Sequence, residues 1–233
     1  VYKRQKVYDA ILGLKPEEKD AYFLRGSAEL ELGDYESAKA DFDQAISMDP
    51  KNYDRLIEIY EALAAHGYRE VGQEYLQNVL DTAKQLDAYD SGRIYYYLGE
   101  YQKAYLALDE ARDKGGADSY LYLGRAYAAT GDYNYASSVY NNYLSKQGPN
   151  AEIYNELGLC EMAKKEYQNA LAAFQAGKQI EGNSLMQTLC FNEIVAYEYL
   201  EDYQQAEVLM NAYLQNYPDD QTAIREQQFL STR

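Results

Sequence analysis

A short motif that recurs along the whole chain constrains the fold more than any other feature. The segments LGDYESA, LGEYQKA, TGDYNYA, KKEYQNA and LEDYQQA each place a tyrosine three residues before an alanine. These alanines, with one glycine that takes their place, are Ala38, Gly72, Ala104, Ala136, Ala170 and Ala206. Successive members lie 32 to 36 residues apart. A period in this range indicates stacked repeats, each of which buries its apolar face only against its neighbours.

Each repeat is predicted to contain two helices. Between the markers, apolar residues recur at spacings of three and four, as in AYFLRGSAEL and SYLYLGRAYAA. Glycine enters the left-handed conformation that ends a helix without a Cβ penalty, and it follows four of the predicted first helices, at Gly33, Gly67, Gly99 and Gly131. Prolines stop three of the second helices, at Pro50, Pro149 and Pro218. No segment alternates with period two, so we expect an all-α chain.

Charge and composition exclude several classes of function. The 233 residues include 38 acidic and 22 basic side chains, a formal net charge of −16 that repels phosphate backbones and argues against nucleic acid as a partner. No apolar run approaches the roughly 20 residues that span a bilayer. Cys160 and Cys190 are too few for a disulfide framework and are interpreted as small buried hydrophobic residues. The compartment stays open between a cytoplasmic protein and an exported or surface-anchored bacterial protein whose signal has been removed.

Residues that carry catalysis or bind metals are scarce. His66 is the only histidine, which excludes a Ser–His–Asp triad, an HExxH zinc site and a two-histidine metal site. The pair Gly177–Lys178 lacks the flanking residues of a phosphate-binding P-loop. Acidic pairs such as Glu17–Glu18 are typical of a solvated face. We therefore expect no enzymatic activity, no cofactor and no metal.

The repeats resemble those of the tetratricopeptide repeat family. Unit 117–150 carries the family's pattern of large and small residues in Tyr120, Leu123, Gly124, Tyr127, Ala136 and Tyr140. The resemblance implies a right-handed superhelical solenoid of helix–turn–helix repeats as a single domain over 1–233. Its expected parts are a half repeat at 1–18, repeats at 19–52, 53–86, 85–118, 117–150, 151–184 and 187–220, and a capping helix at 221–233. Unit 53–86 departs from the pattern at Tyr60 and Gly72, which predicts looser packing of its two helices.

The resemblance also implies a binding surface, because first helices line a concave groove in that family. Carried onto this chain, the candidate groove residues are Tyr89, Arg93, Tyr96, Tyr97, Leu121, Arg125, Asn155, Phe191 and Tyr199. Aromatic residues beside arginines are typical of protein-binding hot spots. The two arginines could receive a partner's carboxylate, stack on an aromatic ring or neutralise the chain's own acidic residues. The lysine-and-asparagine clamp of chaperone-binding members is absent, which argues against heat-shock chaperones as partners.

We therefore expect a non-catalytic scaffold whose concave face binds a protein or an extended peptide. Two alternatives stay open. The groove tyrosines could act as stacking platforms for a carbohydrate or another small ligand. The terminal helices, which lack partners within the repeat scheme, could instead support self-association into a structural assembly.

Overall fold

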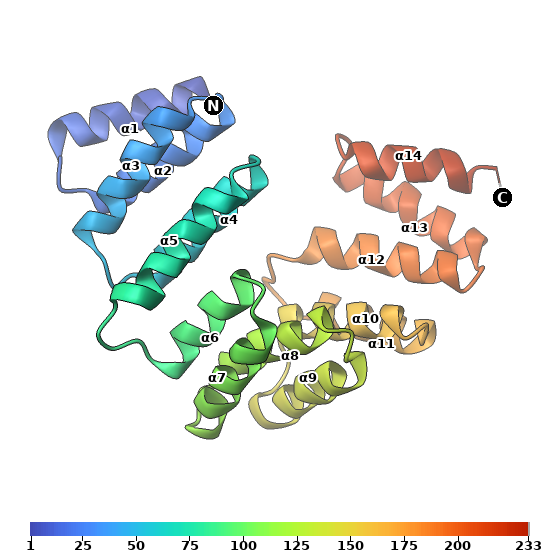
Figure 1. Ribbon diagram of the computed structural model, residues 1–233. Coiled ribbons are helices and arrows are strands. Elements are labelled where there is room, and N and C mark those ends of the chain that lie inside the picture. Colours follow the sequence, from blue (N-terminus) through green and yellow to red (C-terminus); the bar gives the residue numbers. More distant parts are fainter. Residues whose placement is uncertain (233) are drawn as a thin grey trace. The chain divides into compact units, whose positions relative to one another are not determined.

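The structure is a computed structural model that describes residues 1–232, and within them it contains fourteen helices and no strand (Figure 1). Two compact units divide the chain. The first, Val1–Glu100, holds α1 (Tyr2–Leu14), α2 (Lys19–Glu31), α3 (Tyr35–Met48), α4 (Tyr53–Ala65), α5 (Arg69–Thr82) and α6 (Ala88–Tyr97). The second begins at Tyr101 and holds α7 (Tyr101–Asp113), α8 (Ser119–Ala129), α9 (Tyr133–Gln147), α10 (Ala151–Ala163), α11 (Tyr167–Lys178), α12 (Met186–Tyr199), α13 (Tyr203–Asn216) and α14 (Gln221–Leu230).

Five of the predicted repeats coincide with pairs of packed helices inside one unit. These pairs are α2–α3, α4–α5, α8–α9, α10–α11 and α12–α13. The repeat predicted at 85–118 corresponds to α6 and α7, which belong to different units. The all-α, helical-repeat fold class is therefore confirmed, while the single continuous domain stays a prediction. Among the described helices, none has both the length and the apolarity that crossing a membrane requires.

The turn inside each repeat has the same geometry throughout. The residue after the first helix has a positive φ of 79° to 88° at Gly33, Gly67, Gly99 and Gly131, as the glycines predicted. In two repeats a residue with a side chain takes this position, Lys165 at φ 64° and Glu201 at φ 60°. The Lys165 turn is closed like the glycine turns, since the Glu166 N–H donates to the Glu161 carbonyl at 2.9 Å. The left-handed turn is thus a requirement of the repeat rather than a consequence of glycine.

A glycine facing an aromatic ring joins the two helices of several repeats. An added Cβ at Gly26 would lie 2.8 Å from the Phe42 ring, and at Gly158 it would lie 2.3 Å from the Phe174 ring. Gly124 faces Tyr140 in the same way. All three rings are completely buried. Removing the side chain from one helix therefore allows the other to place a ring between the two backbones.

In the repeat 53–86 the two members of this pair exchange helices. The first helix carries the ring, at Tyr60, and the second carries the glycine, at Gly72, whose added Cβ would lie 2.9 Å from that ring. Tyr60 is only 4% exposed. The departure that predicted looser packing is therefore compensated, since the glycine of α5 makes room for the ring of α4.

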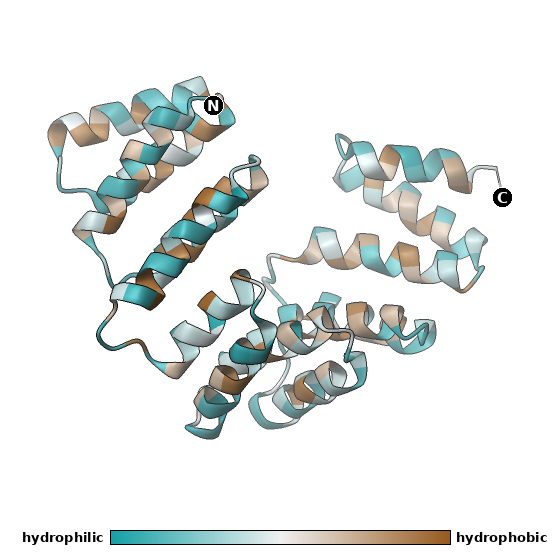
Figure 2. Cartoon of the chain, viewed as in Figure 1, coloured by the Kyte–Doolittle hydropathy of each residue, from teal (hydrophilic) through white to brown (hydrophobic). Residues whose placement is uncertain are grey.

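Apolar residues on successive helices form clusters inside each unit. Figure 2 shows how hydrophobic and hydrophilic residues alternate along the helices. One cluster of the first unit joins Leu30, Phe42 and Ile59, which come from α2, α3 and α4. One cluster of the second joins Ile194, Met210 and Leu230 from α12, α13 and α14. Thus α14 packs onto the repeat before it, where a capping helix was expected; Arg233, the end of the predicted 221–233 cap, lies outside the described residues. Cys160 is buried as predicted, whereas Cys190 is partly exposed, and both are free thiols.

Candidate binding surface

In the first unit, ion pairs connect the first helices of successive repeats. Arg55 of α4 pairs with Asp20 of α2 at 2.7 Å, and Arg93 of α6 pairs with Asp54 of α4 at 2.5 Å. Both acids are the second residue of their helix, where the helix dipole favours a negative charge. We call these two pairs the polar ladder of the first unit.

Arg93, a predicted groove residue, lies inside this ladder. It is 6% exposed, pairs with both Asp54 and Asp90, and its guanidinium carbon lies 4.4 Å from the centroid of the Tyr89 ring. Burial alone would lower the pKa of Arg93, but the hydrogen bonds to the two aspartates outweigh burial and raise it. The sequence allowed three roles for the Arg93 guanidinium. In the structure it pairs with the chain's own aspartates and lies over an aromatic ring.

The other predicted residues of α6 lie beside this arginine. The Tyr96 and Tyr97 rings meet edge to face with centroids 5.2 Å apart, and the Tyr97 hydroxyl donates to Glu61 of α4 at 2.6 Å. The Tyr97 ring also tilts against Tyr60 at 5.2 Å. Two of the four candidates on α6, Arg93 and Tyr97, thus contact α4, and the Tyr89 and Tyr96 rings lie against them.

The second unit has a corresponding polar ladder. Arg125 of α8 pairs with Glu156 at 2.6 Å and with Glu152 at 3.0 Å, both on α10. The Asn192 side chain of α12 donates to Asn155 of α10 at 2.9 Å. Burial would lower the pKa of Arg125, but the two glutamates raise it. Side chains on three successive first helices are therefore bonded from one repeat to the next.

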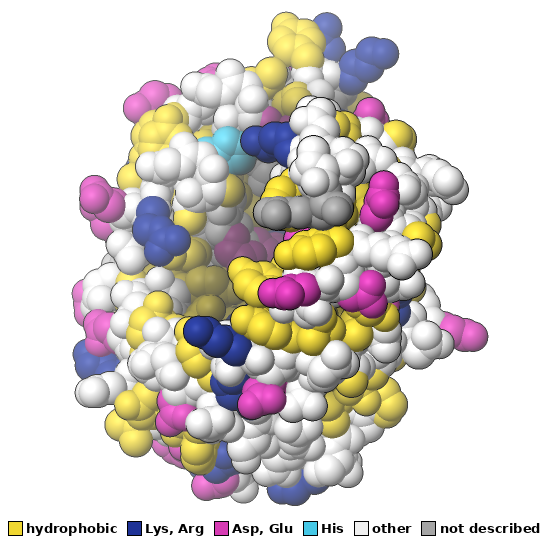
Figure 3. Space-filling view, turned by 90° about the vertical axis from the view of Figure 1, so that its right-hand side faces the viewer, with side chains coloured by type: hydrophobic (Ala, Val, Ile, Leu, Met, Phe, Trp, Pro, Cys, Tyr) yellow, Lys and Arg dark blue, Asp and Glu magenta, His cyan; other side chains and the backbone are white. Residues whose placement is uncertain are grey.

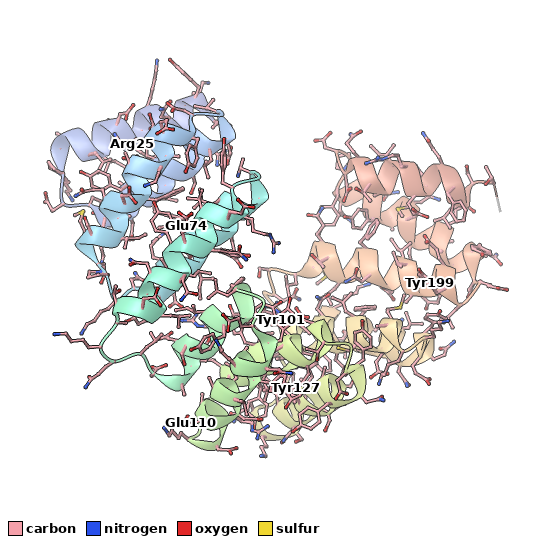
Figure 4. All side chains as sticks on the ribbon, in the orientation of Figure 1. Arg25, Glu74, Tyr101, Glu110, Tyr127 and Tyr199 are labelled. Atoms are coloured by element: carbon pink, nitrogen blue, oxygen red, sulfur yellow. The ribbon has the colours of Figure 1, made fainter. Side chains whose placement is uncertain are left out.

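The three remaining candidates differ in their exposure to solvent. Leu121 packs against the apolar cluster around Tyr140. The Phe191 ring lies edge to face with Tyr213 of α13, which places it against the interior. Tyr199, labelled on α12 in Figure 4, is 58% exposed and stacks on Tyr167 with centroids 5.1 Å apart.

Sequence reasoning missed the acidic half of both ladders. Asp20, Asp54 and Glu152 all occupy the second position of a repeat, so the recurring acid was a visible signal for an inter-repeat pair. Leu159 of α10 is 42% exposed and lies in the same repeat position as Arg93 and Arg125. Figure 3 shows other exposed hydrophobic side chains scattered among charged ones on one face of the molecule.

Within the described residues no group of three or more histidine, cysteine, aspartate or glutamate side chains could hold a metal ion. Burial, with a smaller contribution from Glu226, raises the pKa of Glu198 on α12 to about 7. The chain's own acidic residues pair with these arginines, and the first helices of the second unit also expose the apolar and aromatic side chains of Leu159 and Tyr199.

Comparison with known proteins places this geometry in a family. The description Tetratricopeptide repeat is matched at residues 19–52 by one family model and at 89–140 and 123–183 by another. No curated protein sequence matches the chain.

Solved structures agree on the fold. Yeast Tom70 is 15% identical with a TM-score of 0.63, over 92% of this chain and 47% of its own. A thermophilic tetratricopeptide repeat protein from Thermus thermophilus is also 15% identical, with a TM-score of 0.57, over 92% of this chain and 100% of its own. YrrB, described as a protein with an unusual peptide-binding site, is 16% identical with a TM-score of 0.53, over 95% of this chain and 97% of its own. The chain therefore spans about half of Tom70 and the whole length of the two smaller proteins.

Proposed function

Because this chain belongs to the tetratricopeptide repeat family, whose fold serves as a scaffold for protein interactions, we propose that it binds an extended peptide segment of a partner protein along its first helices. In the second unit these are α8, α10 and α12. One observation carries the proposal: Leu159 and Tyr199 remain 42% and 58% exposed on two helices whose neighbouring polar side chains are already bonded to one another. The likeness to YrrB, a peptide-binding protein by its description, supports the same class of ligand.

The polar ladder of the second unit limits which peptides this surface can bind. Arg125 has two glutamate partners, so a partner's carboxylate would have to displace one of them. The net charge of −16 further disfavours acidic segments. The proposed ligand is therefore a neutral or basic segment with apolar side chains, for which Leu159 and Tyr199 act as anchors and Asn155 holds the supporting helices in place.

A peptide library displayed on phage would identify ligands, and titration calorimetry would map them. Replacing Leu159 or Tyr199 with alanine should weaken a selected peptide about tenfold or more, since each removes a large apolar contact. Leu106→Ala and Val208→Ala are matched controls, because these residues are 69% and 58% exposed on the second helices α7 and α13. Equal losses of peptide affinity in all four variants would contradict the proposed surface. Selection of uniformly acidic peptides would contradict it as well.

The carbohydrate alternative has less support. Among the groove tyrosines, Tyr199 stacks on Tyr167 with ring centroids 5.1 Å apart, and the Arg93 guanidinium lies 4.4 Å from the centroid of the Tyr89 ring. A ring covered on one face by its neighbour offers less platform to a sugar.

A further inference from the structure

A buried carboxyl group lies between α1, α2 and α3 without a close positive partner. Glu29 of α2 is only 5% exposed, although glutamate is almost never fully buried unless it is paired. Its Oε1 atom accepts a long hydrogen bond, 3.4 Å, from the Gln5 side chain of α1. Its Oε2 atom is buried and has no hydrogen-bond partner among the described residues. Burying a charged oxygen in this way is costly, so the ionised form of this carboxyl is disfavoured.

The guanidinium group beside Glu29 is already engaged. Arg25, labelled in Figure 4, donates to both carboxylate oxygens of Asp41 on α3, at 2.6 and 2.8 Å, and to Asp9 of α1 at 3.0 Å. Its Nε atom lies 3.9 Å from Glu29, which is beyond hydrogen-bond distance. Asp41 is itself only 6% exposed. Two buried carboxyl groups thus share one guanidinium, and the bidentate geometry assigns it to Asp41.

Charges on the neighbouring elements do not supply the missing partner. On α1, Arg4 pairs with Glu31 at 2.6 Å. On α4, which also packs against α2, Arg55 pairs with Asp20 at 2.7 Å. In the turn after α2, Asp34 adds a further negative charge that acts on the buried carboxyl. The surroundings are therefore acidic as well as dry.

Both conditions favour the protonated form of Glu29. Burial is the largest cause, and repulsion from Asp41 and Asp34 adds to it, while Gln5 and Arg25 act in the opposite direction. Together they raise the pKa of Glu29 from 4.5 to about 7. A protonated carboxyl is neutral and can donate a hydrogen bond, so it avoids both the cost of burial and the repulsion.

From this arrangement we propose that Glu29 forms a pH-sensitive contact, which holds α1 against α2 while the carboxyl is protonated and loosens α1 when the proton is lost. In an opened α1 the carboxyl would meet water, and its pKa would return toward 4.5. Packing of α1 is therefore favoured most below that pH and is weakened as the pH rises through 7. Leu12 is the only buried residue of α1, so little other packing offsets the loss. The contact uses neither Leu159 nor Tyr199, so it is independent of the peptide-binding surface proposed above.

Nuclear magnetic resonance can test both halves of the proposal on the 1–233 chain. Carbon-13 shifts of the glutamate carboxyls would titrate Glu29, with Glu29→Gln used to assign its signal, and we expect an apparent pKa near 7. Hydrogen exchange of the α1 amides would report the packing. Their protection factors should fall by up to about tenfold from pH 6 to pH 8, the change expected if opening moves the pKa from 7 to 4.5. In Glu29→Gln, which keeps the shape and stays neutral, the protection factors should be equal at both pH values.

Two further variants separate Glu29 from its neighbours. Glu31→Gln removes the ion pair with Arg4, another contact between α1 and α2, and should leave the fall from pH 6 to pH 8 intact. Asp41→Asn frees Arg25 to bind Glu29, so the apparent pKa of Glu29 should move toward 4.5 and the effect of pH on α1 should shrink. An apparent pKa near 4.5 in the unmodified chain would overturn the proposal. So would a fall in α1 protection that persists in Glu29→Gln, or an Asp41→Asn variant in which the apparent pKa of Glu29 is unchanged.

Discussion

At the scale of single residues, the pairing of glycine and aromatic ring sets how closely two helices approach. Gly158→Ala places a Cβ against the buried Phe174 ring, and such overpacking costs about 1–3 kcal/mol. This outweighs the roughly 1 kcal/mol by which alanine favours a helix over glycine. We expect a lower urea midpoint, and partial recovery when Phe174→Leu is added. Gly13→Ala is the control, since nothing lies within 4 Å of its added Cβ and the substitution should be neutral or stabilising.

The turn residues with positive φ lead to a second prediction. A side chain in the left-handed region costs about 1–2 kcal/mol, whereas the extra flexibility of glycine in the unfolded chain costs about 0.5–1 kcal/mol. Lys165→Gly and Glu201→Gly should therefore each raise the free energy of unfolding by up to about 1 kcal/mol. The neighbouring substitution Lys164→Gly, at a right-handed φ of −78°, should lower it. Denaturant titrations in which all three variants lose stability would contradict the argument from backbone strain.

At the scale of helices, α1 and α10 represent the two extremes of burial. Only Leu12 is buried in α1, whereas seven residues of α10 are buried. Opening α1 exposes little apolar surface, so its amides should exchange with solvent among the fastest of all the helices. Hydrogen exchange read by mass spectrometry on a dilute sample would check this. Protection of α1 equal to that of α10 would mean that α1 is held by more than its contacts with α2.

The contact of α12 with α14 should depend on pH. Burial and Glu226 raise the pKa of Glu198 from 4.5 to about 7 in the folded chain, so folding favours its protonated form. The resulting stabilisation is complete below about pH 4.5 and is lost as the pH rises through 7. Glu198→Gln, which stays neutral, should raise Tm at pH 8 and change it little at pH 4. An equal change in Tm at both pH values would show that the proton on Glu198 is not linked to folding.

The sequence predicted the elements more fully than it predicted the contacts between them. Period and glycine placement were enough for the helix pairs and for four of the six turns, because both depend on local backbone preferences. The left-handed conformation of Lys165 and Glu201 was not predicted, because neither residue type favours it. The burial of Arg93 was also not predicted, because it depends on Asp54 of the previous repeat as well as on its own helix. Which surface binds a ligand stays a prediction.

At the scale of the whole molecule, net charge and local ion pairs act in opposite directions. A charge of −16 repels itself in the folded state, and this repulsion weakens as the Debye length falls from about 30 Å at 0.01 M salt to about 8 Å at 0.15 M. The ion pairs of Arg93, which is buried, and of Arg125, which is partly buried, are screened less, so Tm should rise over this range. Sodium and potassium chloride should act alike if the effect is screening. A fall in Tm would mean that the ion pairs dominate.

The exchanged pair Tyr60 and Gly72 has a consequence for protein engineering. Swapping single helices between repeats would assume that every first helix is interchangeable. Grafting α4 in place of α2 would place the Tyr60 ring against the Phe42 ring, where there is space for only one ring. Grafting α2 in place of α4 would place Gly26 against Gly72 and leave a void. Whole repeats are therefore the smallest interchangeable parts of this chain, because size complementarity belongs to the helix pair.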